Sequence, residues 1–270
     1  MAVVVALHAH PDDEVLLTGG TLAALAAQGH HVRVVFATDG AAGLTDQRGD
    51  LGLVRTREAL AASAILGLAP PLWLGYADSG EQGRRPAHAF ADADVDDAAT
   101  RLADILTEGR ADMLLTYDRH GGYGHPDHRQ AHLVGVAAAA RAGTPRILEA
   151  TVDRTLLRRV TAGLRLVPGL PAGFRATRLT DGFTARGDIT HRLDVRDQCA
   201  AKRAALAAHV SQAAGGDEQR TLALFLRLPM PLFRRVLGYE WFREEAALQV
   251  DGPSGLRSDL GLATSSRRHP

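Results

Sequence analysis

Residues 8–14 read His-Ala-His-Pro-Asp-Asp-Glu and directly follow an unbroken apolar run at residues 2–7. A short apolar run rich in β-branched residues is typical of a strand buried on both faces of a parallel sheet. Gly19-Gly20 and an Ala/Leu-rich segment at residues 21–28, which favours a helix, come next. The polar stretch therefore lies between the end of a predicted strand and the start of a predicted helix. Because ligands of open α/β sheets bind at the carboxyl ends of strands, this stretch predicts a functional site.

The polar stretch packs one imidazole and three carboxylates into the five residues from His10 to Glu14. Like charges at this spacing repel one another unless a cation, a proton or hydrogen bonds relieve them. Zinc accepts both imidazole nitrogen and carboxylate oxygen, and a catalytic zinc takes three protein ligands and a water. Acidic residues are also favourable at a helix N-terminus. That alternative accounts for one or two of the acids but not for His10.

A second polar cluster repeats this arrangement. Residues 117–128 read Tyr-Asp-Arg-His-Gly-Gly-Tyr-Gly-His-Pro-Asp-His and follow another short apolar run at 113–116. Residues 131–141 then favour a helix. Each cluster contains a His-Pro-Asp core at the carboxyl end of a predicted strand, where ligands bind in open α/β sheets. Together the two clusters provide enough ligands for one metal ion and leave further residues for acid–base chemistry.

Strands and helices alternate along the first 150 residues. Further strands are predicted at 31–38, 72–75 and 146–152, and further helices at 53–66 and 95–106. Alternation of this kind implies parallel strands joined by right-handed crossovers. The predicted fold is therefore α/β, a Rossmann-like and mostly parallel sheet flanked by helices, with a less regular C-terminal part.

The sequence is expected to form a single domain over residues 1–250, followed by a disordered tail at 251–270. In the C-terminal part, a strand is predicted at 189–194, a long helix at 195–214 and a closing strand at 238–242.

Two other C-terminal segments have a weaker pattern. Residues 151–182 combine scattered Arg and Leu with Pro and Gly, which predicts a helical piece and a loop. We expect this variable segment to lie on the substrate side. Residues 222–237 are strongly apolar and are expected to pack on the core, with a surface patch for a partner or a membrane as the alternative.

Composition narrows the functional class. The chain has 270 residues, of which 46% are hydrophobic and 23% charged, and its formal net charge is zero. Such a balance argues against an extended nucleic-acid footprint. The single cysteine, Cys199, excludes an internal disulfide and fits a reducing compartment. No signal peptide and no apolar stretch near the ~20 residues of a membrane span are visible, so we expect a cytoplasmic protein without membrane association.

The two motifs at 10–14 and 125–128 resemble the paired motifs of the LmbE-like (PIG-L) family of zinc-dependent N-acetylglucosaminyl deacetylases. The longer stretch at 121–128 is similar to the bacterial branch that acts on mycothiol precursors and conjugates. The resemblance runs from residue 3 to about 140 and continues more weakly through 189–212. It implies a Rossmann-like fold and one zinc ion per chain, although other divalent metals remain open.

The resemblance also implies roles for individual residues. His10, Asp13 and His128 correspond to the zinc ligands, which leaves one position for water. Asp12 corresponds to the general base that takes a proton from this water and later protonates the leaving amine. The sequence alone leaves open whether Asp12 or Asp13 is the ligand, and the family pattern favours Asp13.

Three residues of the second cluster would assist the reaction. His125, as an imidazolium, would stabilise the oxyanion beside the metal. Asp127 would hydrogen-bond a histidine and so fix its tautomer or raise its pKa. Tyr123 lies between glycines and resembles a family tyrosine that swings over the site.

Two further residues match family positions that contact the sugar. Arg55 matches an arginine that contacts the sugar or the group attached to it. Asp78, at the end of a predicted strand, matches a ligand of a sugar hydroxyl, although a turn-forming role is the alternative for this aspartate. Glu14 is expected to orient the loop from the start of a helix and not to bind metal.

The expected function is that of a zinc-dependent hydrolase that removes the N-acetyl group from an N-acetylglucosamine-containing small molecule. An amidase acting on a mycothiol-type conjugate and a catalytically silent sugar-binding relative are the alternatives. A phosphate-ester hydrolase is a further class, but two-metal phosphatases need more bridging carboxylates than these clusters offer.

Overall fold

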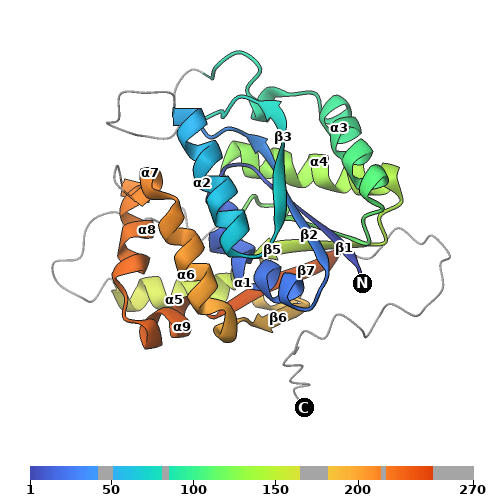
Figure 1. The fold of residues 1–270 in the computed structure, drawn as a ribbon. Coiled ribbons are helices and arrows are strands. Elements are labelled where there is room, and N and C mark those ends of the chain that lie inside the picture. The colour runs from blue at the N-terminus through green and yellow to red at the C-terminus, as the bar shows by residue number, and fades with distance from the viewer. Residues whose placement is uncertain (42–50, 81–84, 165–181, 214–216, 246–270) are drawn as a thin grey trace.

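The computed structural model describes residues 1–41, 51–80, 85–164, 182–213 and 217–245 (Figure 1). Seven strands form its centre: β1 (Val3–His8), β2 (His31–Thr38), β3 (Ala69–Tyr76), β4 (Met113–Tyr117), β5 (Arg146–Thr151), β6 (His191–Asp194) and β7 (Tyr239–Glu245). The α-helices are α1 (Asp13–Ala27), α2 (Leu51–Ile65), α3 (Val95–Gly109), α4 (Pro126–Ala142), α5 (Arg154–Leu164), α6 (Cys199–Ala208), α7 (Val210–Ala213), α8 (Asp217–Arg227) and α9 (Met230–Leu237).

All seven strands belong to one sheet with the order β3-β2-β1-β4-β5-β7-β6. The first five are parallel, whereas β7 runs antiparallel to both β5 and β6. The predicted α/β fold with a mostly parallel sheet is therefore confirmed. The less regular C-terminal part is the antiparallel pair that closes one edge.

The strand order reverses between β1 and β4. From β1 the chain continues outward to β2 and β3, and from β4 it continues in the other direction to β5. The connections that leave β1 and β4 therefore diverge, and in open α/β sheets ligands bind at the carboxyl ends of the strands at such a point. Both polar clusters lie at this switch point.

Side chains of the central strands alternate between two hydrophobic layers. Val4 and Ala6 of β1 pack in one layer with α1, α2 and α6. Val5 and Leu7 pack in the other layer with α3 and α4. Successive residues of a strand point to opposite faces, so β1 is buried on both faces as its unbroken apolar run predicts.

Two helices begin earlier than predicted. α1 starts at Asp13 and runs through Gly19-Gly20, and α4 starts at Pro126. Glycine disfavours a helix interior, but packing overrides this preference here, because a Cβ on Gly20 would lie 2.5 Å from Cγ2 of Val195. Proline at the first helical position is favourable because its missing N–H would be unpaired there. Several candidate site residues therefore lie in first helical turns and not in loops.

The C-terminal elements agree only in part with the pattern of the sequence. The predicted long helix is divided into α6 and α7 at His209. Phe233 of α9 is fully buried in the core, as expected for the apolar segment, whereas Leu232 and Val236 are exposed. Of the variable segment the structure describes residues 151–164, which hold the end of β5 and α5, and residue 182, whereas the tail at 251–270 lies outside the described residues. None of the helices that the structure describes is long and apolar enough to cross a membrane.

A buried ion pair fixes α1 to the C-terminal part. Nζ of Lys202 donates to Oε1 of Glu240 at 2.6 Å, and both side chains are at most 2% exposed. The same carboxylate accepts the backbone N–H groups of Gly20 and Thr21, each at 2.8 Å. Through these contacts β7 and α6 hold the helix that carries part of the candidate site.

Lys202→Met is expected to lower the free energy of unfolding by about 3–5 kcal/mol, because it leaves the Glu240 carboxylate buried without its cation. Chemical denaturation measures the change. The matched control is Arg227→Met, at an exposed arginine of α8, where a change below about 0.5 kcal/mol is expected. A loss no larger than that of the control would show that the ion pair does not hold α1.

Candidate active site

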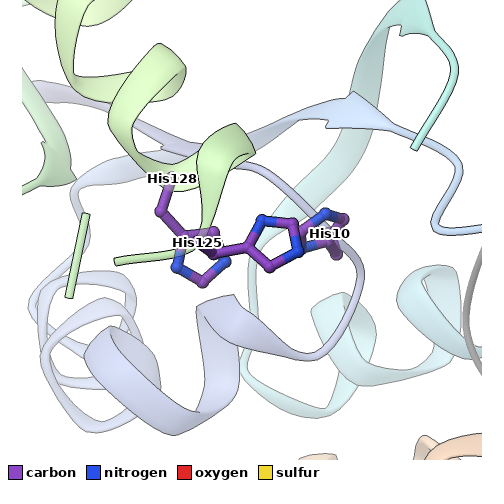
Figure 2. Close-up of side chains that lie close together, drawn as sticks. All are labelled: His10, His125 and His128. Carbon is purple, nitrogen blue, oxygen red and sulfur yellow. The ribbon is translucent and has the colours of Figure 1, made fainter. Parts of the chain in front are cut away.

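Three histidines from the two clusters lie side by side at the switch point (Figure 2). His10 follows β1, whereas His125 caps α4 and His128 lies in its first turn. One ring nitrogen from each histidine can be chosen so that all three lie within 4.8 Å of one another, and all three residues are buried. His125 and His128 are 115 or more residues from His10 in the sequence, and the three meet because β1 and β4 are adjacent in the sheet.

Asp13 contacts both of the other predicted ligands, His10 and His128. Its Oδ2 atom lies 3.2 Å from Nδ1 of His10 and 3.2 Å from Nε2 of His128. The hydroxyl of Tyr117 donates to the same oxygen at 2.7 Å. Nε2 of His128 is buried and makes no well-formed hydrogen bond with any described residue, despite its short distance to Asp13. Two imidazoles and a carboxylate that converge in this way, with a ring nitrogen left unbonded, fit the donor set of a catalytic zinc.

A second group of possible ligands overlaps with this set. His10, Asp78, His125 and Asp127 also offer ligand atoms that all lie within 4.8 Å of one another. Nε2 of His10 is 3.1 Å from Oδ2 of Asp127 and 3.4 Å from Oδ1 of Asp78. Asp127 additionally accepts the N–H and the hydroxyl of Ser79. Its carboxylate thus contacts a histidine, as predicted, and this histidine is His10.

The charges of the cluster stabilise one another. Burial alone would lower the pKa of His10, but Asp78, Asp127 and Asp13 raise it well above its usual value. Burial would likewise raise the pKa of Asp13, but His128 and His10 hold it well below the ordinary carboxyl range. Opposite charges within a few ångströms have this effect in a buried site.

His125 differs from the sequence-based expectation. Burial, together with the neighbouring His10 and His128, lowers its pKa to about 3, so the predicted imidazolium is not favoured in this arrangement. The backbone N–H of Asp127 donates to Nδ1 of His125 at 3.1 Å. A neutral ring whose Nδ1 accepts a hydrogen bond carries its proton on Nε2. His125 is therefore suited to donate a hydrogen bond as a neutral imidazole.

Asp12 lies beside the cluster and is more accessible than its neighbours. Its side chain is 18% exposed and 3.3 Å from Nη2 of Arg55. Burial raises its pKa to about 6; Arg55 opposes this shift, and Asp13 adds to it. A carboxylate with this pKa can accept and return a proton near neutral pH, as the predicted general base must.

Arg55 forms hydrogen bonds with the backbone of the loop that carries Asp12. It is only 3% exposed, and it donates to the backbone oxygens of Pro11 at 2.7 Å and Gly40 at 2.6 Å. Asp78 is also buried, at 6% exposed, and faces His10. The structure thus gives Arg55 and Asp78 contacts within the protein, and their predicted contacts with a sugar stay a prediction.

Tyr123 lies at the site, as its place in the motif predicts. The centroid of its ring is 5.2 Å from that of His128 and 6.1 Å from that of His125. The flanking Gly122 and Gly124 have φ values of 60° and 99°, which favour glycine over other residues.

Three residues that the sequence analysis did not assign also shape the site. The hydroxyl of Tyr117 accepts the N–H of Ala9 at 3.0 Å and donates to Asp13, so it connects both clusters. Ser79 holds Asp127, and His209 holds Glu14 at 2.9 Å. Tyr117 belongs to the second motif, but no pattern indicates where its hydroxyl points. His209 is 195 residues from Glu14, and no local pattern joins such residues.

The His209–Glu14 pair predicts a pH dependence of stability. Both side chains are fully buried. Burial and Arg55 lower the pKa of His209, but Glu14 and Asp12 outweigh them and raise it above 6.5. The folded state therefore binds a proton more tightly than the unfolded state. This stabilisation is complete below pH ~6.5 and is lost as the pH rises through the pKa of the folded state.

Urea denaturation of the metal-free protein between pH 6 and pH 9 tests this pH dependence. We expect the free energy of unfolding to fall more steeply with rising pH in the wild type than in His209→Gln. The total difference between the two proteins should be about 1.4 kcal/mol for each pH unit by which the pKa of His209 is raised. Equal slopes in both proteins would contradict the assigned pair.

Comparisons with known proteins identify relatives of this chain. The family model described as GlcNAc-PI de-N-acetylase (PIG-L) matches residues 5–139. A relative from Mycolicibacterium smegmatis, named 1D-myo-inositol 2-acetamido-2-deoxy-alpha-D-glucopyranoside deacetylase, is 36% identical over 96% of this chain and 93% of its own length.

Two solved structures show the same fold. N,N'-diacetylchitobiose deacetylase from Pyrococcus horikoshii has a TM-score of 0.58 and 23% identity, covering 90% of this chain and 84% of its own. GalB, the 4-carboxy-2-hydroxymuconate hydratase from Pseudomonas putida KT2440, has a TM-score of 0.54 and 19% identity, covering 94% of this chain and all of its own. One fold thus carries different reactions, so the reaction must be argued from the site.

Proposed function

Because the chain belongs to the GlcNAc-PI de-N-acetylase (PIG-L) family, we propose that it is a metal-dependent deacetylase that hydrolyses the N-acetyl group of an N-acetylglucosamine-containing small molecule. The observation that carries this proposal is the convergence of His10, Asp13 and His128 beside Asp12. It combines a set of metal ligands with an accessible carboxylate whose pKa is about 6.

The proposed metal is one zinc ion, held by His10, Asp13 and His128. Bound zinc lowers the pKa of a water toward ~7 and polarises the carbonyl of the substrate. The unbonded Nε2 of His128 and the shared oxygen of Asp13 support this assignment. Tyr117 donates to that oxygen and thereby orients the carboxylate.

Asp12, His125 and Tyr123 perform the proton and hydrogen-bond chemistry in this proposal. Asp12 takes a proton from the attacking water and passes it to the departing amine, so that free amine and acetate result. His125 donates from Nε2 to the oxygen that becomes negative as the carbonyl is attacked. Tyr123, beside both His125 and His128, closes the site over the acetamide. Asp127 holds His10 with its carboxylate and His125 with its N–H.

For the substrate, we propose a glucosaminide linked to inositol, as in the names of several relatives. An amide of a mycothiol-type conjugate is the alternative. We propose that Arg55 contacts the sugar or the group attached to it and that Asp78 binds a sugar hydroxyl. Cytoplasmic localisation is also proposed, and the buried free thiol of Cys199 supports it.

Release of free amine from a panel of acetamido-glucosides tests the function. The panel contains the inositol glucosaminide, a simple alkyl N-acetylglucosaminide and a mycothiol-type conjugate, each with metal-stripped protein and with one equivalent of added zinc. We expect zinc-dependent release of amine and acetate, fastest with the inositol glucosaminide. Fastest cleavage of the conjugate would indicate an amidase. No turnover of any substrate despite a bound zinc would contradict the proposal and indicate a silent sugar-binding protein.

A further inference from the structure

The backbone of Asp12 has a conformation that is rare for residues other than glycine. Its φ is 120° and its ψ is −34°. Such a backbone costs energy and persists only where surrounding contacts hold it, and residues of this kind gather at functional sites. Asp12 lies directly before α1 and next to the cluster of ligands. The contacts that hold it therefore determine where its carboxylate points.

The carboxylate of Asp12 does not cap its own helix. An aspartate at this position ordinarily accepts an N–H from the first helical turn. Asp12 makes no such side-chain bond, although its backbone oxygen accepts the N–H groups of Val15 and Leu16 at 3.1 and 3.2 Å. Its carboxylate lies near Arg55 and is partly exposed. The unusual backbone thus keeps the carboxylate available for other chemistry.

Glu14 holds the backbone of Asp12 from within the helix. Its Oε2 accepts the N–H of Asp12 at 2.7 Å. This bond resembles one half of a capping box, in which the third helical residue reaches back to the N–H of the N-cap residue, but here it comes from the second helical residue. Glu14 is 0% exposed and belongs to neither group of possible ligands, so its part in the site passes through Asp12.

His209, which is 195 residues from Glu14 in the sequence, contacts its side chain. Its Nε2 lies 2.9 Å from Oε1 of Glu14, and it is also 0% exposed. His209 lies at the break between α6 and α7, where its ψ of 61° ends the helix. Because of this break, a side chain from the C-terminal part reaches the first turn of α1.

We propose that Glu14 and His209 are positioning residues for Asp12, which together hold its backbone in the rare conformation that presents its carboxylate to the substrate. The proposal deepens the proposed function and rests on Asp12 being the general base. Neither side chain makes a described hydrogen bond or ion pair with His10, Asp13 or His128, and both are 0% exposed, so their effect on the site is transmitted through Asp12. A misplacement of about 1 Å in a catalytic group can cost roughly 10²-fold in rate.

A double-mutant cycle between Glu14→Ala and Asp12→Ala tests the proposal, with metal-loaded full-length protein and the best acetamido-glucoside of the panel. In the wild-type background, Glu14→Ala is expected to lower kcat by about 10²-fold. KM and the bound zinc per chain should change less than about twofold. In the Asp12→Ala background, the same substitution should change the residual rate less than about twofold, because the group that it positions is absent.

Conservative and control variants separate positioning from stability. Glu14→Gln keeps an oxygen that can accept the N–H of Asp12 and should restore most of the rate. His209→Ala enters the same cycle and replaces Glu14→Ala if that protein does not fold. Asp94→Ala is the matched control, because Asp94 also accepts backbone N–H groups at a helix start, those of Asp96 and Asp97 at 2.8 and 3.0 Å, and has no contact with Asp12 among the hydrogen bonds and ion pairs described. Its kcat should stay within about twofold.

The possible results distinguish this proposal from the function on which it rests. If Glu14→Ala lowers the rate by the same factor in both backgrounds, or only by loss of metal, Glu14 does not position Asp12. An unchanged kcat in both Glu14→Ala and His209→Ala would also overturn the proposal. If Asp12→Ala itself retains the full rate, the assignment of the general base fails first.

Discussion

Asp12→Asn is expected to lower kcat by about 10²- to 10⁴-fold, the usual contribution of a positioned acid–base group. Asparagine keeps the size of the side chain but cannot accept a proton from water. The structure places Asp12 beside the ligand cluster and not at its centre, with Arg55 as the side-chain partner. Metal binding should therefore persist. Steady-state kinetics and metal analysis on the same preparation measure both quantities.

Asp104→Asn provides the matched control, because Asp104 is an exposed carboxylate on α3. It should keep the full rate. If Asp12→Asn protein loses its metal together with its activity, the roles of Asp12 and Asp13 are exchanged. The sequence alone leaves this exchange open, and the shared contacts of Asp13 with both histidines argue against it.

Asp13→Ala and His125→Ala are expected to have different effects on metal, although both should reduce turnover by at least about 10²-fold. Asp13→Ala removes the oxygen on which His10 and His128 converge. The affinity for zinc should fall on the order of 10- to 100-fold or more. We therefore expect less than one zinc per ten chains after dialysis. His125→Ala removes a hydrogen-bond donor and should retain one zinc per chain.

These two variants decide between the overlapping ligand groups. His10, His125 and His128 also form a set with suitable separations. If that set binds the metal, His125→Ala protein will lose zinc and Asp13→Ala protein will retain it. Measurement of bound zinc together with circular dichroism excludes unfolding as the cause. The exposed Asp104→Asn variant again serves as the control and should bind one equivalent.

The sequence predicts the fold and the composition of the cluster well, for identifiable reasons. The apolar runs at 2–7 and 113–116 are long enough to identify buried strands, and the polar residues after them are dense enough to indicate a common site. Adjacent parallel strands then bring His10 and His128 together. Only the adjacency of these two strands had to be supplied by the structure, since strand order is not encoded in any local pattern.

Other features depend on contacts between distant residues. The early start of α1 reflects packing of Gly20 against Val195, which outweighs local helix preference. The lowered pKa of His125 reflects its burial and its two histidine neighbours. Arg55 is predicted to contact the sugar, and the three oxygens that it binds in the structure come from two loops, one at Pro11 and Asp12 and the other at Gly40. No periodicity or motif contains such information.

Two of the three candidate ligands, Asp13 and His128, come from helices that cover opposite faces of the sheet. α1, which carries Asp13, packs in one hydrophobic layer, and α4, which carries His128, packs in the other. A bound ion would therefore act as a cross-link between two halves of the core that the sheet otherwise separates. A shift of one layer relative to the other would change the separation of Asp13 and His128, so bound metal would report on the alignment of the two layers.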